Sequence, residues 1–272
     1  MDIHTYLANF SNENEKPLDN LVEDGGFCSI LRTVGCVGDS LSSGDFEAYK
    51  DGAKIYLDFY DYSWGQFLAR MAGCKVYNFS KGGMTAQEYM ETFADKQLFW
   101  NTDKACQAYV IALGVNDVIN KRQEVGSLSD ICPEDWRKNK PTFAGFYAQV
   151  IQRLKEIQPD AKFFFVTIPR NGTEPTENEQ IRDAHAALLH EMAGFFSNSY
   201  VIDLRRYAPV YDEAFRIRFF MGGHMNPCGY VLTAKMIVSY IDYIIRHNVA
   251  DFREIAFVGT PYRNGRLEID RR

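Results

Sequence analysis

Short apolar runs that alternate with helical patterns constrain this 272-residue chain more than any other feature. The runs lie at 32–38, 75–80, 107–113, 162–168 and 200–204, and their β-branched and aromatic residues predict buried strands. Apolar residues at helical spacing predict helices at 64–72, 142–158, 177–196 and 227–247. Strands that are almost wholly apolar and alternate with helices predict a parallel sheet covered on both faces.

The composition favours one large domain. The chain is 46% hydrophobic and 24% charged, and it contains no linker-like stretch or internal repeat. We therefore predict an N-terminal extension at 1–31, an α/β domain at 32–247 and a C-terminal tail at 248–272. The tail carries two strand-like runs, 255–258 and 266–269, which we expect to pack on the domain or on a second subunit of a homo-oligomer.

The charge balance bears on the kind of partner. Thirty basic against 36 acidic residues give a net charge of -6, without a long block of like charge. This argues against nucleic acid or an anionic membrane as a main partner, and favours a small-molecule substrate. The N-terminus has neither a basic region nor an apolar core like those of a signal peptide, so we expect a cytoplasmic protein.

No metal or nucleotide cofactor is expected. The six cysteines form no Cys-x-x-Cys pair, and His185 and His190 lie too far apart along a helix to share a metal, so we predict that both histidines are at the surface. Gly35-x-x-Gly38 follows a strand, but the chain lacks both Gly-x-Gly-x-x-Gly and Gly-Lys-Ser/Thr.

The ends of the first three predicted strands carry glycines and polar residues. Ser40 follows the first strand, Gly83 the second and Asn116 the third. The carboxyl ends of parallel strands share one edge of a sheet, where ligands bind. A serine hydrolase needs a nucleophile, hydrogen-bond donors for an oxyanion and a nearby base. His224, in a glycine-rich loop just before the helix that Asn226 is expected to cap, is the candidate base.

These residues carry a family resemblance. Gly38-Asp39-Ser40-Leu41, Gly83, Gly114-Val-Asn116-Asp117 and His224 occur in that order and resemble the four blocks of the SGNH, or GDSL, hydrolase superfamily. The resemblance implies a three-layer α/β/α sandwich with a parallel, flavodoxin-like five-stranded sheet, and an esterase without a cofactor. It implies that Ser40 is the nucleophile and His224 the base. The oxyanion hole would comprise the Ser40 and Gly83 amides and the Asn116 side chain. Apart from the resemblance, we expect Asp39 and Asp117 to hold loops and to take no part in the chemistry.

The sequence departs from this family at one position. Members usually carry an Asp three residues before the histidine, and here that residue is Met221. The His224 side chain would then be held by a backbone carbonyl, have no partner at all, or bind a substitute acid, of which Asp212 and Glu213 are nearest in sequence.

The interpretation is a serine carboxylester hydrolase that deacylates a small or carbohydrate ester through an acyl-enzyme intermediate. Two alternatives stay open: a catalytically weak protein that binds a glycan or a partner with the same cleft, and an O-acyltransferase. Segment 41–62 is expected to be a substrate-binding loop. The aromatic side chains in and just after this segment either line a sugar-binding cleft or pack beneath the loop. They are Tyr49, Tyr56, Tyr60, Tyr62 and Trp64.

Overall fold

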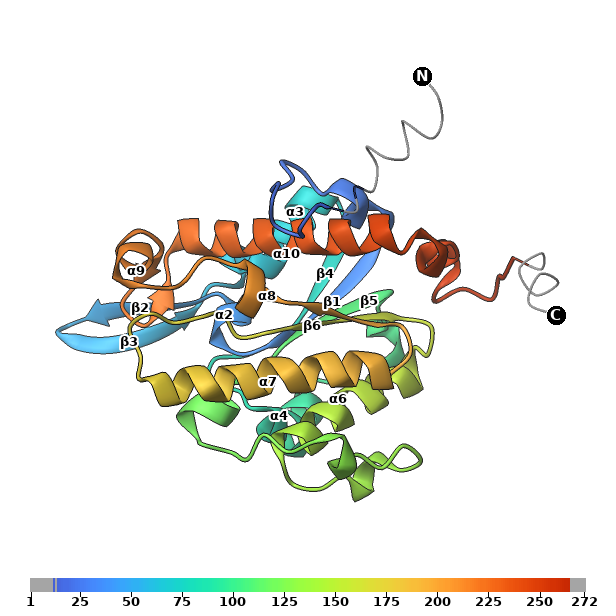
Figure 1. The fold of residues 1–272 in the computed structure, drawn as a ribbon, viewed down its shortest axis with the longest axis horizontal. Coiled ribbons are helices and arrows are strands. Elements are labelled where there is room, and N and C mark those ends of the chain that lie inside the picture. The colour runs from blue at the N-terminus through green and yellow to red at the C-terminus, as the bar shows by residue number, and fades with distance from the viewer. Residues whose placement is uncertain (1–11, 13, 265–272) are drawn as a thin grey trace.

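A five-stranded parallel sheet forms the centre of the computed structural model, which describes residue 12 and residues 14–264 (Figure 1). Its strands are β1 (Thr33–Gly38), β4 (Lys75–Ser80), β5 (Ala108–Ala112), β6 (Lys162–Val166) and β7 (Ser199–Ile202). They are arranged in the order β4-β1-β5-β6-β7, and every neighbouring pair is parallel. This is the flavodoxin-like order, in which the second strand along the chain lies outside the first.

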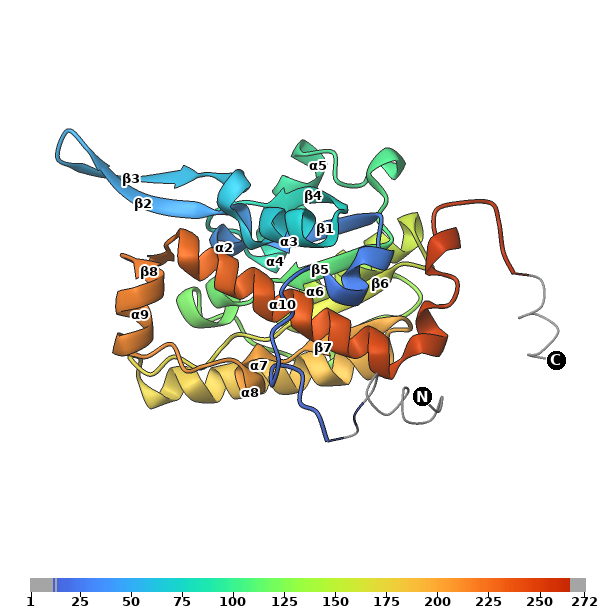
Figure 2. The same ribbon diagram turned by 90° about the horizontal axis from the view of Figure 1, so that it is seen from above.

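Helices cover both faces of the sheet (Figures 1 and 2). One layer holds α3 (Trp64–Ala72) and α10 (Pro227–His247), and the other holds α6 (Phe143–Ile157), α7 (Thr176–Phe195) and the short α4 (Ala86–Glu88) and α5 (Ala94–Lys96). The predicted α/β/α sandwich is confirmed. By length and composition alone α10 could cross a membrane, but 72% of its most apolar window is buried, as in the core helix of a globular domain.

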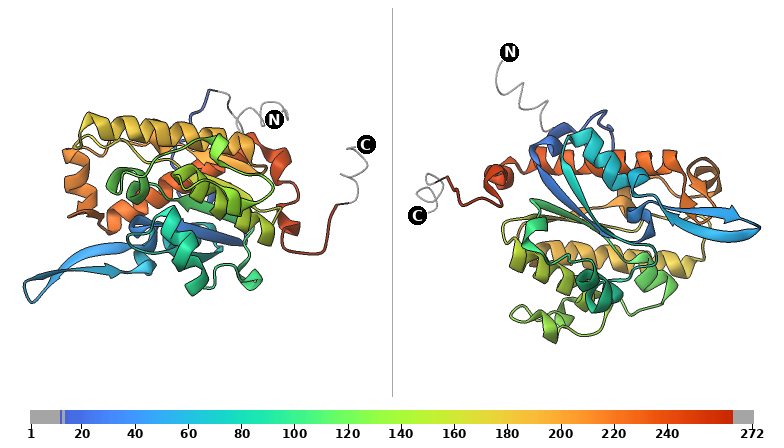
Figure 3. Two further views of the ribbon diagram at one scale, coloured as in Figure 1. Left: turned by 90° about the horizontal axis from the view of Figure 1, so that it is seen from below. Right: turned by 180° about the vertical axis from the view of Figure 1, so that it is seen from behind.

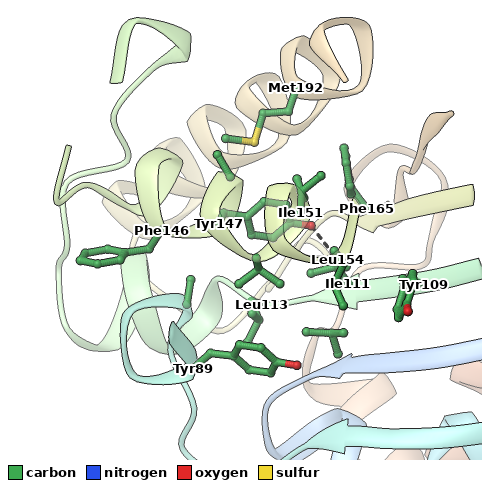
Figure 4. Close-up of a cluster of buried hydrophobic side chains, with 14 of the residues drawn as sticks. Tyr89, Tyr109, Ile111, Leu113, Phe146, Tyr147, Ile151, Leu154, Phe165 and Met192 are labelled. Atoms are coloured by element: carbon green, nitrogen blue, oxygen red, sulfur yellow. Dashed lines mark hydrogen bonds between the residues drawn. The ribbon is translucent and has the colours of Figure 1, made fainter. Parts of the chain in front are cut away.

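Aromatic side chains fill the core between the sheet and α6. Figure 4 shows Tyr89, Tyr109, Tyr147 and Phe165 packed among aliphatic side chains from α6, α7 and β5. The buried Tyr147 hydroxyl donates a hydrogen bond to the Ile111 carbonyl at 3.2 Å, so the one polar atom of this side chain is satisfied in the core. The bond fixes α6 against β5, the strand that leads to Asn116.

A β-hairpin projects from the edge of the sandwich (Figures 2 and 3). It consists of the antiparallel strands β2 (Asp45–Lys50) and β3 (Ala53–Asp58). Their turn residues Asp51 and Gly52 have φ values of 53° and 80°, as a two-residue hairpin turn requires. The expected loop over 41–62 is therefore wrong as to secondary structure, because alternating residues on each side of Asp51-Gly52 pair as strands. Its role in binding substrate stays a prediction.

Four short elements precede α10. They are α8 (Leu204–Tyr207), α9 (Glu213–Phe219) and the two-residue strands β8 (Phe220–Met221) and β9 (His224–Met225), which pair with each other. Strand β9 lies against β2 of the hairpin. This contact brings the hairpin beside His224.

Both terminal segments pack on the domain where the structure describes them. In the N-terminal segment, the Val22 amide donates to Ser239 Oγ and the Phe27 amide to Asp242 Oδ1, both on α10. In the tail, the Ile255 carbonyl accepts from Gln107 Nε2 at 2.6 Å. The predicted strand at 255–258 is wrong, since Ile255–Phe257 is a 3-10 helix. The run at 266–269 lies outside the described residues.

Candidate active site

One cavity at the carboxyl edge of the sheet brings the predicted site residues together. Ser40, Gly83, Asn116 and His224 all line it, and its volume is about 590 Å³. It lies beyond the ends of β1, β4 and β5, where the strand order reverses and where ligands bind in open α/β sheets. Its size is within the range of small-molecule sites.

A tight turn presents Ser40 directly after β1. The four-residue helix α2 (Ser40–Ser43) starts at Ser40, and Asp39 caps it by accepting the Leu41 amide at 3.1 Å. A side chain at Gly38 would collide with Ser42 Oγ, because a Cβ there would be 2.1 Å away. Burial raises the pKa of Asp39 to about 6. The predicted role of Asp39 in holding the loop agrees with this cap.

Gly83 and Asn116 can both offer N–H groups to the cavity. Gly83 has a φ of 78°, which only glycine adopts easily, and a Cβ there would meet no atom within 4 Å. The Asn116 amide is oriented by two bonds: its Oδ1 accepts from Asn120 Nδ2 at 2.8 Å, and its Nδ2 donates to the Met84 carbonyl at 3.1 Å. An amide nitrogen carries two hydrogens, so one N–H of Asn116 is left for a ligand.

Asp117 joins the loops that carry Gly83 and Asn116. Its side chain is fully buried, and its Oδ1 accepts the Ala86 amide at 2.7 Å. Its Oδ2 is buried and has no hydrogen-bond partner among the residues that the structure describes, and burial raises the pKa of Asp117 to about 7. The hydrogen bond from the Ala86 amide agrees with the predicted role of Asp117 in holding loops.

The prediction that His185 and His190 are surface residues is wrong for His185. His185 is fully buried and hydrogen-bonds with the Leu113 carbonyl at 3.3 Å. Burial lowers the pKa of this imidazole to about 4, which keeps it neutral. A Cβ at Gly114 would lie 2.5 Å from His185 Nε2, so His185 packs under the turn that leads to Asn116. Its place on the apolar side of α7 is the signal that the sequence analysis missed.

Acidic side chains of the hairpin surround His224. The nearest oxygens are Asp45 Oδ2, 3.8 Å from Nε2, and Glu47 Oε1, 3.4 Å from Nδ1. The Tyr56 ring meets the imidazole edge-on, with 5.7 Å between centroids. As predicted, Asn226 caps α10 just beyond this loop by accepting the Gly229 amide at 2.9 Å.

Sequence reasoning missed Glu47. The carboxylate accepts the Gly223 amide at 2.6 Å and pairs with Lys54 at 2.6 Å. The hydrogen bond from Lys54 and the Gly223 amide lower the pKa of Glu47. By contrast, the two acids proposed from the sequence do not line the cavity: Asp212 caps α9, and Glu213 lies beside it at another surface hollow.

The aromatic residues divide between the two roles considered for them. Tyr56 lines the cavity, whereas Trp64 is buried and donates to Ser42 Oγ at 3.2 Å beneath the Ser40 turn. Tyr49 and Tyr62 are exposed on the outside of the hairpin region. Within residues 14–264, no group of three or more His, Cys, Asp or Glu side chains is arranged to hold a metal ion.

The sequence model of the GDSL-like Lipase/Acylhydrolase family matches residues 36–232, well over half of the chain. The chain belongs to this family. The match includes the Ser40, Gly83, Asn116 and His224 blocks, and membership in a family of acylhydrolases supports an activity on ester bonds. No curated protein matches the sequence.

Solved structures share the fold of this GDSL-like protein at low sequence identity. A Lactobacillus plantarum protein is 15% identical with a TM-score of 0.57, over 78% of this chain and 97% of that one. A family two carbohydrate esterase from Clostridium thermocellum, solved with cellohexaose, is 15% identical with a TM-score of 0.56, over 81% and 65%. A family 3 carbohydrate esterase from the same organism is 14% identical with a TM-score of 0.51, over 79% and 98%. These matches establish the fold.

The buried Asp117 predicts a pH-dependent stability. Its pKa is raised from an ordinary value near 4 to about 7, so the folded state binds this proton more tightly than the unfolded state does. Its contribution to stability is therefore full below pH 4 and is lost as the pH rises through 7. The unfolding free energy of the wild type should therefore fall between pH 5 and pH 8 by roughly 2 kcal/mol more than that of Asp117→Asn, which has no titrating group at this position.

Denaturant unfolding at a series of pH values measures this difference. Asp95→Asn, at an exposed position, is the matched control and should follow the wild type. Parallel curves for Asp117→Asn and the wild type would contradict the assignment.

Proposed function

We propose that this GDSL-family protein is a serine carboxylester hydrolase. The observation that carries the proposal is the single cavity in which Ser40, Gly83, Asn116 and His224 meet. It supplies a hydroxyl, N–H groups and an imidazole at the switch point of the sheet, which are the parts that acyl transfer through a serine requires.

In the proposed reaction Ser40 Oγ attacks the ester carbonyl carbon and His224 accepts the hydroxyl proton. The carbonyl oxygen becomes an oxyanion that the Ser40 and Gly83 amides and the Asn116 side chain stabilise. The C–O bond to the alcohol then breaks, and His224 returns the proton to that alcohol. Water, activated by the same imidazole, hydrolyses the acyl-Ser40 ester and regenerates the hydroxyl.

A second cavity supports a short acyl group. It is lined mainly by apolar side chains, shares Asp39, Leu41 and Val115 with the first, and has a volume of about 80 Å³. Since an apolar cavity of about 150 Å³ accepts benzene, this one holds fewer than six carbons. An acetyl or slightly longer acyl group would fit where an octanoyl chain would not.

The leaving-alcohol side of the first cavity favours a polyhydroxylated group. Tyr56 offers an aromatic ring, and Asp45 and Asp58 offer carboxylates, which accept hydrogen bonds from hydroxyls. The structural neighbours described as carbohydrate esterases support the same substrate class. We therefore propose acylated carbohydrates as substrates, with no cofactor.

The binding-protein alternative depended on the missing acid at Met221. The structure weakens this alternative, because the Glu47 carboxylate of β2 lies 3.4 Å from His224 Nδ1. An acid is thus present beside the imidazole, although it comes from another element.

Ester chain length tests the proposal. Purified protein should hydrolyse p-nitrophenyl acetate and butanoate faster than the octanoate, because the acyl cavity is small, and EDTA should leave the rate unchanged. A fluorophosphonate probe should label the wild type and not Ser40→Ala. A labelled or active Ser40→Ala protein would contradict the assignment of the nucleophile, and no labelling of the wild type would favour a binding protein.

Asn116 should act on the chemical step. Asn116→Ala should lower kcat roughly 100- to 1,000-fold, the usual loss for one oxyanion-hole donor. Asn116→Asp keeps the shape and removes the donor, so it should lose as much. If steady-state kinetics found a change in KM alone, Asn116 would not be a donor to the transition state.

A further inference from the structure

We infer that Glu47, supplied by the hairpin strand β2, is the residue that positions the His224 imidazole through Nδ1. The inference rests on the proposed function, since it concerns the same base. It replaces the acid that the family usually carries three residues before the histidine.

The Nδ1 atom of His224 needs an acceptor. It is buried and has no hydrogen-bond partner in the part of the chain that the structure describes. Glu47 Oε1 lies 3.4 Å away, and both side chains are shielded from water, with 17% and 11% of their surfaces exposed. A buried donor without an acceptor is costly, and catalytic hydrogen bonds are often long until substrate binds. A small rotation of the imidazole would complete this one.

The loop before His224 is shaped around the Glu47 carboxylate. Cβ atoms would lie 2.3 Å from Oε2 at Gly222 and 2.4 Å from Oε1 at Gly223, so side chains at these positions would displace the acid. The Gly223 amide also donates to Oε1 at 2.6 Å. The two glycines therefore make room for Glu47 and fix one of its oxygens beside His224.

The charges around His224 favour Glu47 over Asp45 for this role. Lys54 and the Gly223 amide lower the pKa of Glu47 and keep it ionised, whereas burial raises the pKa of Asp45. Asp45 is also near Nε2, the nitrogen that must stay open to Ser40 if Nδ1 is held. The hairpin supplies most of the charged and titratable groups near the imidazole: Asp45, Glu47, Lys54, Tyr56 and Asp58. From other elements, Asp39 lines the same cavity, and Arg216 of α9 donates to the Gly222 carbonyl in the loop before His224.

A carboxylate at Nδ1 does two things for the base. It keeps the proton on Nδ1, so that Nε2 is free to accept the Ser40 proton, and it stabilises the imidazolium that results. In a well-studied triad, replacing this acid by its amide lowers kcat about 10⁴-fold.

Glu47→Gln tests the inference in the full-length protein. It should lower kcat roughly 100- to 10,000-fold with little change in KM, and it should move the acidic limb of the kcat/KM profile to lower pH. Asp51→Asn is the matched control: it makes the same carboxylate-to-amide change in the same hairpin, at a turn position with φ of 53° that Asn tolerates. It should keep wild-type kinetics.

A double-mutant cycle tests the contact itself. Gly223→Ala should lower kcat by pushing the carboxylate away, and should cost much less in a Glu47→Ala background, where no carboxylate remains to be displaced. Equal losses in both backgrounds would mean that the alanine acts only on the loop, and would overturn the role assigned to Gly223 and Glu47.

The remaining outcomes separate this inference from the proposed function. If Glu47→Gln keeps wild-type kcat and pH profile while Ser40→Ala is inactive, the inference fails and the hydrolase stands. If Asp45→Asn alone shows the predicted losses, Asp45 is the positioning acid and the inference fails. If Ser40→Ala keeps full activity, the proposed function fails.

Discussion

The site depends on the register of three adjacent parallel strands, which end at the same height in the sheet. Gly38 at the end of β1 is paired with Ser80 of β4 on one side and with Ala112 of β5 on the other. The three chains therefore leave the sheet at the same height, and the turns carrying Ser40, Gly83 and Asn116 open into one cavity. The reversal of strand order at β1 leaves room there that crossover helices would otherwise fill.

Buried polar side chains hold these turns in place. Asp39 accepts the amide of Leu41, Asp117 accepts the amide of Ala86, and His185 hydrogen-bonds with the Leu113 carbonyl. Each bond satisfies a backbone group that the turn leaves without a partner. The raised pKa values of both aspartates show that this order is opposed by the cost of burying a carboxylate. Holding the turns rigid in this way therefore lowers the stability of the folded protein.

Local patterns in the sequence predicted the sheet and four of the site residues, because apolar runs and strand-end glycines act within a few residues. The hairpin also had a local signal, Asp51-Gly52 between alternating residues, and was missed because its length suggested a loop. Glu47 had no such signal. The amide it binds is 176 residues away, and only the packing of β2 against β9 brings the two together. His185, in contrast, had a local signal, because it lies on the apolar side of α7, the side that packs against β6, β7 and the turn at Val115–Asn120.

The hairpin carries both the acid beside His224 and an aromatic residue of the cavity. An acid three residues before the histidine would not be connected to the cavity lining in this way. Glu47 and Tyr56 are directly paired across β2 and β3, so their side chains lie on the same face of the ribbon. Glu47 lies beside His224, and Tyr56 lines the cavity that contains Ser40. In the proposed reaction, a shift of the hairpin that fits Tyr56 to a substrate would also move the Glu47 carboxylate beside His224. Under the proposed function, the hairpin would therefore link binding of the alcohol portion of a substrate to alignment of the His224 imidazole.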